Sequence, residues 1–435
     1  MKTIKVGICG LGTVGSGTYQ LLLQNAGPIA ARAGCNIEVG RIGARRDNPS
    51  CETGETAVSR DIFEVVTDPD IDIVVELIGG TDTALELVRQ AIANGKHVVT
   101  ANKALIAEFG NELLAQAEQA GVSIGFEAAV AGGIPIIKAL REGLAGNRIH
   151  WLAGIINGTG NFILSEMREK GREFADVLAE AQALGYAEAD PSFDVEGIDA
   201  AHKLVILAAI AFGMPLQFDK VFTEGISRIA TIDVEYAEEL GYRIKHLGIA
   251  RRSGDGIELR VHPTLIPEKR LLANVNGVKN AILVEGDAAG PTLYYGAGAG
   301  AAPTASAVVA DIVDLARELA QGQQPVVAGL GVKGASIVEQ RILPIEEVHS
   351  AHYMRMTVED KPGVLSEIAQ IFSKAGISIE ALIQKQPEEG ETRVPVIMLT
   401  NLVEEAKLMA VVAEIEALPN VEGGITRIRV ESLDG

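Results

Sequence analysis

The chain has 435 residues and a formal net charge of −20, a length that accommodates two or three domains with substantial cores. The acidic balance disfavours a nucleic-acid or anionic-membrane partner. The three cysteines (Cys9, Cys35 and Cys51) lack metal-ligand spacing and fit a cytoplasmic protein, and the N-terminus shows no secretory signal.

The N-terminus combines a strand, a glycine-rich turn and a helix. Ile4–Cys9 is a β-rich run, and an amphipathic stretch reaches about Asn25. In a G-x-G-x-x-G turn, the first glycine turns the chain, the second lets backbone approach a pyrophosphate, and the third lets the helix pack on the strand. The motif therefore predicts dinucleotide binding at a helix N-terminus. Its residues are Gly10, Leu11, Gly12, Thr13, Val14 and Gly15.

A second strand, Ile37–Ala44, should contact the cofactor ribose at its end. NAD enzymes usually place an acidic residue there, whereas this chain has Arg45 and Arg46, with Asp47 following. Because guanidinium suits a 2′-phosphate, we expect NADP, with NAD as a further possibility. The alternative is a solvated basic loop.

Three further apolar runs predict strands at Ile71–Ile78, Lys96–Thr100 and Val122–Phe126, with helices between them. This alternation predicts a doubly wound parallel sheet of the Rossmann type over residues 1–130. The carboxyl edge of such a sheet binds the cofactor, so we expect Gly79 and its neighbours to line it.

The segment from Leu184 to Lys203 crowds five carboxylates and a lysine ahead of the most apolar tract of the chain, which continues to Leu216. If a buried helix begins near Ile198, Asp199 and Lys203 share one of its faces. The simplest interpretation is a helix-stabilising ion pair. With Glu188 and Asp194 in the preceding loop, the segment also suits a pocket for a small cationic polar molecule, with a lysine as proton donor.

This segment resembles the signature of homoserine dehydrogenases, Ala-x3-Gly-aromatic, Glu, Asp-Pro-x2-Asp-hydrophobic-x-Gly-x-Asp-x3-Lys, from Ala181 to Lys203. The resemblance implies NAD(P)H-dependent interconversion of L-aspartate 4-semialdehyde and L-homoserine. In that reaction Lys203 would donate the proton, and Glu188 and Asp199 would bind the substrate ammonium. Asp194 would order the loop or bind indirectly.

The resemblance extends to earlier and later segments. It implies that Lys103 lies between nicotinamide and substrate, that Gly185 and Gly300 lie beside the cofactor, and that a glycine-rich turn binds a monovalent cation such as Na⁺. The cation ligands would be the carbonyls of Glu127, Val130, Gly132 and Ile134. The alternatives are a surface lysine at a helix start, tight domain packing and an ordinary tight turn.

Residues 131–320 would form an α+β substrate and dimerisation domain, closed by a helix over Ala305–Leu319. In the Gly154–Leu164 segment, Asn157 and Thr159 suit turn and helix-cap roles, with a near-substrate contact as the alternative. Two rival functions are an NADP oxidoreductase acting on another amino-acid aldehyde or ketone, and a non-catalytic amino-acid sensor.

A connector over 321–348 leads to a tail, 349–435, whose patterns predict a βαββαβ ferredoxin-like sandwich. With Asp360-Lys361-Pro362-Gly363 at its first turn, the tail resembles an ACT domain. This implies a regulatory module that binds an amino acid, with L-threonine the leading effector, near Gly363 and Gly376. We expect a monofunctional homodimer or homotetramer, whose activity survives removal of the residues after Leu343.

Overall fold

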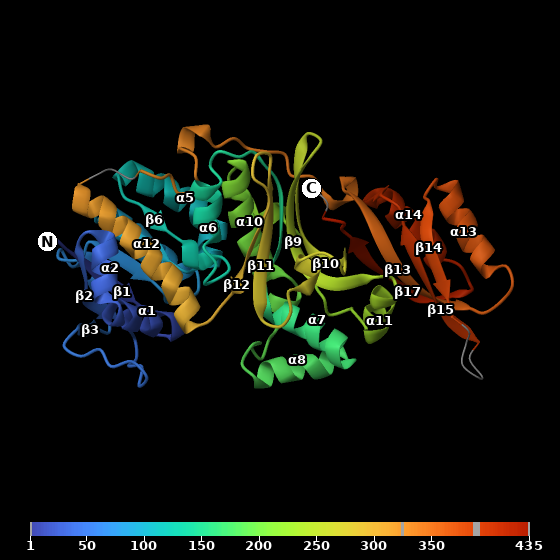
Figure 1. Ribbon diagram of the computed structural model, residues 1–435, viewed down its shortest axis with the longest axis horizontal. Coiled ribbons are helices and arrows are strands. Elements are labelled where there is room, and N and C mark those ends of the chain that lie inside the picture. Colours follow the sequence, from blue (N-terminus) through green and yellow to red (C-terminus); the bar gives the residue numbers. More distant parts are fainter. Residues whose placement is uncertain (1, 323–325, 386–391, 434–435) are drawn as a thin grey trace. The chain divides into compact units, whose positions relative to one another are not determined.

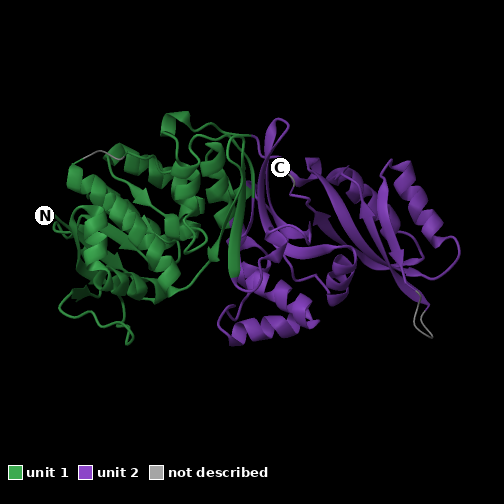
Figure 2. Cartoon of the chain, in the orientation of Figure 1, with its two compact units in different colours: residues 1–152, 202–219, 279–340 green, residues 153–201, 220–278, 341–435 purple. Residues whose placement is uncertain are grey.

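The computed structural model describes residues 2–322, 326–385 and 392–433 and divides into two compact units (Figure 2). Unit 1 comprises residues 1–152, 202–219 and 279–340, and unit 2 comprises residues 153–201, 220–278 and 341–435. The sequence also predicts an acidic turn at Pro387–Glu391, which lies outside the described residues. Among the described helices, none is long and apolar enough to cross a bilayer.

Unit 1 is built on a six-stranded sheet of order β3-β2-β1-β4-β5-β6, in which every pair is parallel. Its strands are β1 (Thr3–Cys9), β2 (Asn36–Gly43), β3 (Ala57–Ser59), β4 (Ile73–Glu76), β5 (His97–Thr100) and β6 (Ile124–Gly125). Every residue of β4, β5 and β6 is buried, as in a parallel sheet covered on both faces, whereas β2 and β3 toward the other edge are partly exposed. The order is that of a doubly wound dinucleotide-binding sheet, which confirms the predicted fold class of this region.

Helices cover this sheet, and one group of them shares a core with β1 and β2 (Figure 1). That group contains α1 (Thr13–Gln24), α2 (Ala26–Ala33) and α12 (Ala301–Gln321). A second group contains α3 (Phe63–Thr67), α4 (Asp82–Ala93) and α5 (Lys103–Ala120). The long helix α12 therefore completes the nucleotide-binding unit, although nearly 300 residues separate it from β1 in sequence.

Two strands of unit 1 are shorter than their apolar runs predicted. β4 begins at Ile73, after Asp72, which contacts Lys5 twice: its backbone N–H donates to the Lys5 carbonyl (2.9 Å), and its side chain accepts the Lys5 N–H (2.8 Å). β6 ends at Gly125 because the chain then turns into a 3₁₀ helix, Glu127–Ala129, whose first N–H donates to Asp311. β3 and α2 were not predicted.

Unit 1 also holds a β-hairpin and short helical segments. The hairpin pairs β11 (Lys279–Gly286) with β12 (Gly290–Ala297) in antiparallel register. The other elements are α6 (Ile136–Lys138), a π-helical turn (Ala139–Gly143) and a 3₁₀ turn (Gly334–Ser336). β7 (Ile149–Ile155) and α10 (Ile198–Phe212) each contain a point where the chain passes from one unit to the other.

Unit 2 combines a long hairpin with the C-terminal tail. In its sheet the strands follow the order β9-β10-β17-β13-β15-β14, with β8 (Phe222–Thr223) beside β10. The strands are β9 (Tyr242–Ser253), β10 (Gly256–Pro267), β13 (His349–Glu359), β14 (Ile379–Gln384), β15 (Arg393–Thr400), β16 (Val403–Glu404) and β17 (Val421–Val430). The helices are α7 (Gly158–Lys170), α8 (Phe174–Ala183), α9 (Ser192–Val195), α11 (Thr231–Glu239), α13 (Val364–Lys374) and α14 (Glu405–Glu416). The remaining 3₁₀ turns are Phe218–Lys220, Leu272–Asn274 and Ile345–Glu347.

The tail has the predicted βαββαβ order, and its four main strands lie in the sequence β17-β13-β15-β14. It belongs to the same compact unit as the preceding β-hairpin, because its last strand β17 pairs in parallel with β10. One hydrophobic cluster also includes Phe162 of α7 together with Tyr353, Leu399 and Ile428 of the tail. The tail therefore shares a sheet and a core with the other parts of unit 2, residues 153–201 and 220–278.

Buried charges join the same two parts. Arg260 of β10, 1% exposed, donates to Glu258 (3.0 Å) and to Glu431 just after β17 (2.5 Å). Arg251 also donates to Glu431, at 2.7 Å. Burial raises the pKa of Glu431, but Arg260 and Arg251 outweigh it and lower that pKa to about 2. A buried arginine of the hairpin thus depends on a carboxylate that the tail supplies.

Candidate active site

The glycine-rich turn has the geometry of a phosphate cradle. Gly10 has φ +105°, and a Cβ added to Gly15 would lie 2.0 Å from the Gly10 carbonyl oxygen, so neither position accepts a side chain. A Cβ on Gly12 would meet nothing within 4 Å. Because Gly12 is exposed and immediately precedes α1, the helix N-terminal N–H groups are open to an anion.

Arg45 and Arg46 are exposed just beyond β2. The nearby carboxylate of Asp47 accepts from Arg60 at 2.7 Å, and Arg60 also donates to the Ala44 carbonyl at 3.2 Å. The only acidic side chain that immediately follows the strand therefore has a cationic partner. The sequence did not single out Arg60, which adds a third positive charge to this end of β2.

A buried carboxylate organises the carboxyl ends of β4 and β5. Glu76, fully buried, accepts from the Thr100 hydroxyl (2.6 Å) and from the Ile78 N–H (2.9 Å). Desolvation raises the pKa of Glu76, although these hydrogen bonds oppose the shift. Sequence analysis missed Glu76, because a strand-end acid becomes notable only when its neighbour across the sheet is known.

The predicted residues Gly79 and Lys103 lie at this edge of the sheet. Asn102 accepts from the Leu105 N–H and so caps α5, and its amide donates to the Gly80 carbonyl at 2.6 Å. Gly79 and Gly80 both have positive φ and open space where a side chain would lie. Lys103 is therefore the first residue of a capped helix beside an open edge.

Within unit 1, α5 is fastened to the segment that contains the later part of α10. The Asn111 side-chain amide donates to the Leu216 carbonyl and accepts the Leu216 N–H, each at 2.9 Å. The His202 ring lies 3.4 Å from the Glu108 carboxylate and stacks on Phe218 with ring centroids 4.2 Å apart. The helices that bear Lys103 and Lys203 are thus held together by side chains of unit 1, and both lysines are half-buried.

The predicted cation turn has the backbone shape and the charge that an alkali ion needs. Ala131 and Gly132 adopt left-handed conformations (φ 54° and 50°), which redirect consecutive carbonyls. Both carboxylate oxygens of Glu127 accept backbone N–H groups, of Ile137 and Lys138 (2.8 Å each), and its carbonyl accepts the Val130 N–H at 3.4 Å, a long hydrogen bond. The donor set fits a hard monovalent cation.

A second buried carboxylate, Asp311 of α12, faces this turn. Its Oδ2 accepts the Glu127 N–H at 2.8 Å. Desolvation, reinforced by the Glu127 charge, raises the pKa of Asp311 to about 7, and desolvation also raises the pKa of Glu127. Sequence analysis missed Asp311, which lies 184 positions from Glu127. Among the described residues, no group of three or more His, Cys, Asp or Glu side chains could hold a metal ion.

The first part of the acidic segment, residues 184–190, is mostly exposed, and hydrogen bonds hold its backbone at a few positions. The Thr159 hydroxyl donates to the Tyr186 carbonyl (2.7 Å), and the Gln182 amide donates to the Glu188 carbonyl (3.0 Å). Gly185 and Glu188 are exposed. This arrangement leaves the Glu188 carboxylate accessible while its backbone is held.

Asp194 and Asp199 are brought together by a residue that the sequence suggested as a cap. The Asn157 amide nitrogen donates to Asp194 Oδ1 at 2.7 Å and to Asp199 Oδ2 at 2.8 Å. Asp199 is buried in the first turn of α10, which begins at Ile198 as predicted. Lys203 follows four residues later on the same helix, one turn further along.

The glycine-rich segment before α12, which contains Gly298 and Gly300, meets the cation turn within unit 1. A Cβ on Gly132 would lie 2.6 Å from the Gly298 carbonyl, and the Gly133 N–H donates to the Ala297 carbonyl at 3.0 Å. Gly300 (φ +117°) precedes α12, which begins at Ala301, four residues earlier than predicted. These close approaches explain the small residues of the loop through backbone packing.

The predicted effector residues lie at opposite ends of one helix. Gly363 (φ +100°) precedes α13, and Gly376 (φ +63°) follows its end. Eleven helical residues span roughly 16 Å at the usual rise per residue. On any one chain, a single small amino acid therefore contacts one of these glycines and not both.

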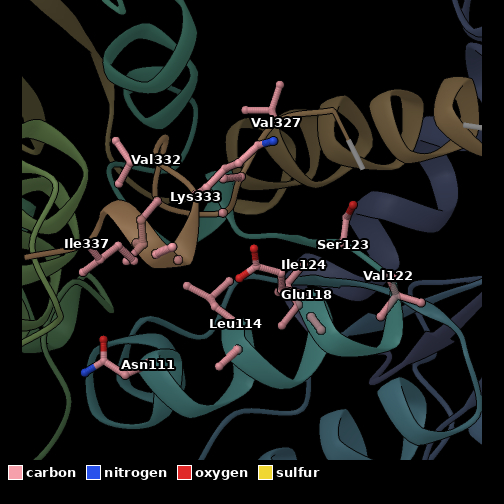
Figure 3. Close-up of a pocket in the computed structure, with 18 of the residues that line it drawn as sticks. Asn111, Leu114, Glu118, Val122, Ser123, Ile124, Val327, Val332, Lys333 and Ile337 are labelled. Carbon is pink, nitrogen blue, oxygen red and sulfur yellow. The ribbon is translucent and has the colours of Figure 1, made fainter. Parts of the chain in front are cut away.

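A cavity of about 770 Å³ lies elsewhere in unit 1, between the second half of α5 and residues 326–337 (Figure 3). Apolar side chains dominate the lining that Figure 3 shows, including Leu114, Val332 and Ile337, with Glu118 and Lys333 at its margin. No predicted site residue lines it.

Comparisons with known proteins show to which family the chain belongs. Family models match residues 135–313 (homoserine dehydrogenase), 10–127 (homoserine dehydrogenase, NAD binding domain) and 352–420 (ACT domain). A homoserine dehydrogenase of Pseudomonas aeruginosa is 63% identical over the full length of both chains. A crystal structure of a homoserine dehydrogenase from Thiobacillus denitrificans is 59% identical, with TM-score 0.96, over 100% of this chain and 99% of that one.

A hyperthermophilic archaeal homoserine dehydrogenase in complex with NADPH matches more distantly. It is 28% identical with TM-score 0.61, over 72% of this chain and 97% of that one. The full-length identity to the bacterial relatives decides the family. The chain therefore belongs to the homoserine dehydrogenases, NAD(P)-dependent oxidoreductases.

Proposed function

We propose that the chain interconverts L-aspartate 4-semialdehyde and L-homoserine with Lys203 as the proton donor. Bound dihydronicotinamide supplies a hydride to the aldehyde carbon. The carbonyl oxygen then gains negative charge, which a lysine ammonium stabilises and neutralises by giving up a proton. In the reverse direction the neutral lysine removes the homoserine hydroxyl proton, and Lys103 assists by orienting the substrate.

We assign recognition of the substrate ammonium to Asp199 and Glu188, with Asp194 ordering the loop. The observation that carries this assignment is the pair of hydrogen bonds from Asn157 to Asp194 and Asp199, one helical turn before Lys203. A pair of closely held carboxylates offers strong charge-assisted acceptors to an ammonium. The exposed Glu188 carboxylate adds a third acceptor on the same loop.

We infer that NADP is the preferred cofactor, bound by the Gly10–Gly15 turn with Gly79, Gly185 and Gly300 nearby. In support, Asp47 is paired with Arg60, while Arg45 is exposed at the end of β2. A guanidinium there suits a ribose 2′-phosphate. The NADPH complex of the archaeal relative points the same way.

We propose that the carbonyls of Glu127, Val130, Gly132 and Ile134 hold a monovalent cation such as Na⁺. The left-handed turn at Ala131 and Gly132 and the buried Asp311 nearby support this proposal. A cation there would rigidify a turn that packs on the Gly298 carbonyl.

We further propose that the enzyme serves threonine and methionine biosynthesis in the cytoplasm as a homodimer or homotetramer. Its three described cysteines are unpaired, which fits a reducing compartment. The ACT domain supports regulation by an amino acid, for which we propose L-threonine, the end product. The ligand would act by favouring a less active conformation.

The decisive experiment follows consumption of NADPH and of NADH by the purified protein with aspartate semialdehyde, with and without threonine. A panel of other amino-acid aldehydes and ketones provides the specificity control. Faster turnover of another aldehyde, or equal use of every one, would contradict the substrate assignment.

A further inference from the structure

The oxygen and the nitrogen of the Asn157 side-chain amide have separate roles. Its Oδ1 accepts the Gly160 N–H at 2.7 Å and so caps α7, as the sequence suggested. Its Nδ2 donates one hydrogen bond to Asp194 at 2.7 Å and one to Asp199 at 2.8 Å. The residue is only 6% exposed, so water does not readily replace the hydrogen-bond partners at either end of its side chain.

An amide is chemically suited to hold two ionised carboxylates together. Two like charges bound to one nitrogen repel each other, and a neutral donor with two N–H groups opposes that repulsion without removing either charge. A lysine would neutralise one carboxylate, a serine has a single proton, and an aspartate would add a third negative charge. The α7 N-terminus, to which Asn157 is fixed, further favours negative charge beside it.

The segment that bears the two aspartates is also held by its backbone. The Ile226 N–H donates to the carbonyl of Val195, the residue after Asp194, at 2.9 Å. Gly197, with φ +86°, packs against the His246 ring. The chain between the two aspartates is therefore anchored at two points, and the Asn157 amide contacts the carboxylate at each end of it.

We propose that Asn157 is a positioning residue of the dehydrogenase reaction, which keeps Asp194 and Asp199 together and ionised for the substrate ammonium. The inference rests on the proposed substrate role of Asp199. It predicts that Asn157 sets the KM for the amino-acid substrate and leaves the KM for the cofactor unchanged.

The test compares Asn157→Asp with Asn157→Ser, since both keep a side-chain oxygen that can cap α7 while they alter the hydrogen-bond donors. Aspartate removes both N–H groups and adds a charge, so the KM for homoserine should rise about 10- to 100-fold near pH 9, the range for lost hydrogen bonds to charged groups. Serine keeps one donor and should give a smaller rise. Cofactor affinity, measured by nucleotide fluorescence, should stay within about twofold of the parent.

The pH profile separates positioning from a merely structural effect. As the pH falls toward 6, the three clustered carboxyl groups of Asn157→Asp should take up a shared proton, which restores a hydrogen-bond donor, and the ratio of variant to parent KM should fall. A defective helix start would produce no such trend. Thermal melts of both variants check that they fold.

Other titratable groups around this cluster are present in both the parent and the variant, so their own titration largely cancels in the ratio of the two KM values. They are Lys203 on the next turn of α10, Glu196, Glu224 and His246. Desolvation lowers the pKa of His246 to about 4, so this ring stays neutral over the tested range. Glu224 is paired with Arg429 at 2.6 Å.

Asp199→Asn distinguishes failure of this inference from failure of the proposed function. If Asp199→Asn raises the KM at least tenfold while both Asn157 variants stay within twofold at every pH, the positioning role is wrong and the substrate assignment stands. If Asp199→Asn also leaves the KM unchanged, the substrate assignment itself fails. A pH-independent loss of kcat with unchanged KM in the Asn157 variants would likewise overturn the positioning role.

Discussion

Replacing Glu431 with glutamine should destabilise the protein markedly, although Glu431 is remote from every proposed catalytic group in sequence. The change leaves the guanidinium of Arg260, 1% exposed, with Glu258 as its remaining carboxylate partner. Breaking a buried ion pair from one side costs about 3–5 kcal/mol. The pKa of Glu431 gives an independent figure. Its fall from 4.5 to about 2 corresponds to roughly 3 kcal/mol at about 1.4 kcal/mol per pH unit.

The two figures agree, and either is a large share of a typical folding free energy of about 5–15 kcal/mol. Because the folded-state pKa is depressed, this stabilisation is present above the unfolded value of 4.5 and is lost as the pH falls toward 2. The difference in stability between parent and Glu431→Gln should therefore be constant from about pH 5 to 8. It should shrink below about pH 4.5.

Urea denaturation of the full-length protein across this pH range measures the difference. Glu422→Gln is the matched control, because Glu422 lies on β17 and pairs with Arg393 (3.0 Å) through a side chain that is 63% exposed. An exposed pair contributes about 1 kcal/mol or less. If Glu431→Gln lost no more stability than Glu422→Gln at pH 7, the argument from the buried arginine would be refuted.

Three further outcomes are expected. Lys203→Ala should lower turnover by about 100-fold or more, the usual range for a general acid, with NADPH binding retained in a fluorescence titration; near-normal turnover would transfer the role to Lys103. Arg45→Ala should weaken the binding of NADPH by roughly 1.5–3 kcal/mol and the binding of NADH much less. Equal increases in the steady-state KM for the two cofactors would mean that the arginine lies outside the nucleotide site. A chain ending at Leu343 should lose stability and activity together, because it removes β17 from β10 and Glu431 from Arg260. A folded and active truncated protein, detected by circular dichroism and turnover, would restore the expectation from the sequence that the tail is separable.

Much of the fold could be predicted because its signals are local. Gly10, Gly12 and Gly15 identify a strand–turn–helix unit, since only glycine permits the positive φ and the close backbone approach that this turn requires. The helix from Ile198 and the order of the tail elements follow from apolar periodicity in the same way. These features depend on residues a few positions apart.

The structure alone revealed the partners of the buried polar groups. The sequence predicted the capping role of Asn157 but not its second role. Its amide nitrogen donates to Asp194 and Asp199, which lie 37 and 42 positions further along the chain, so no local pattern reveals them. Glu76 with Thr100 and Glu127 with Asp311 are likewise invisible to local patterns.

The relation of the tail to the rest of unit 2 was also decided by tertiary structure. The punctuated connector and the ACT resemblance suggested a separable module, whereas β17 joins β10 and Glu431 reaches Arg260. Periodicity identifies which face of an element is apolar but says nothing of which distant face covers it. That choice is made when the chain folds and each buried donor, acceptor and charge must find a partner, because leaving one unpaired costs a large part of the net stability.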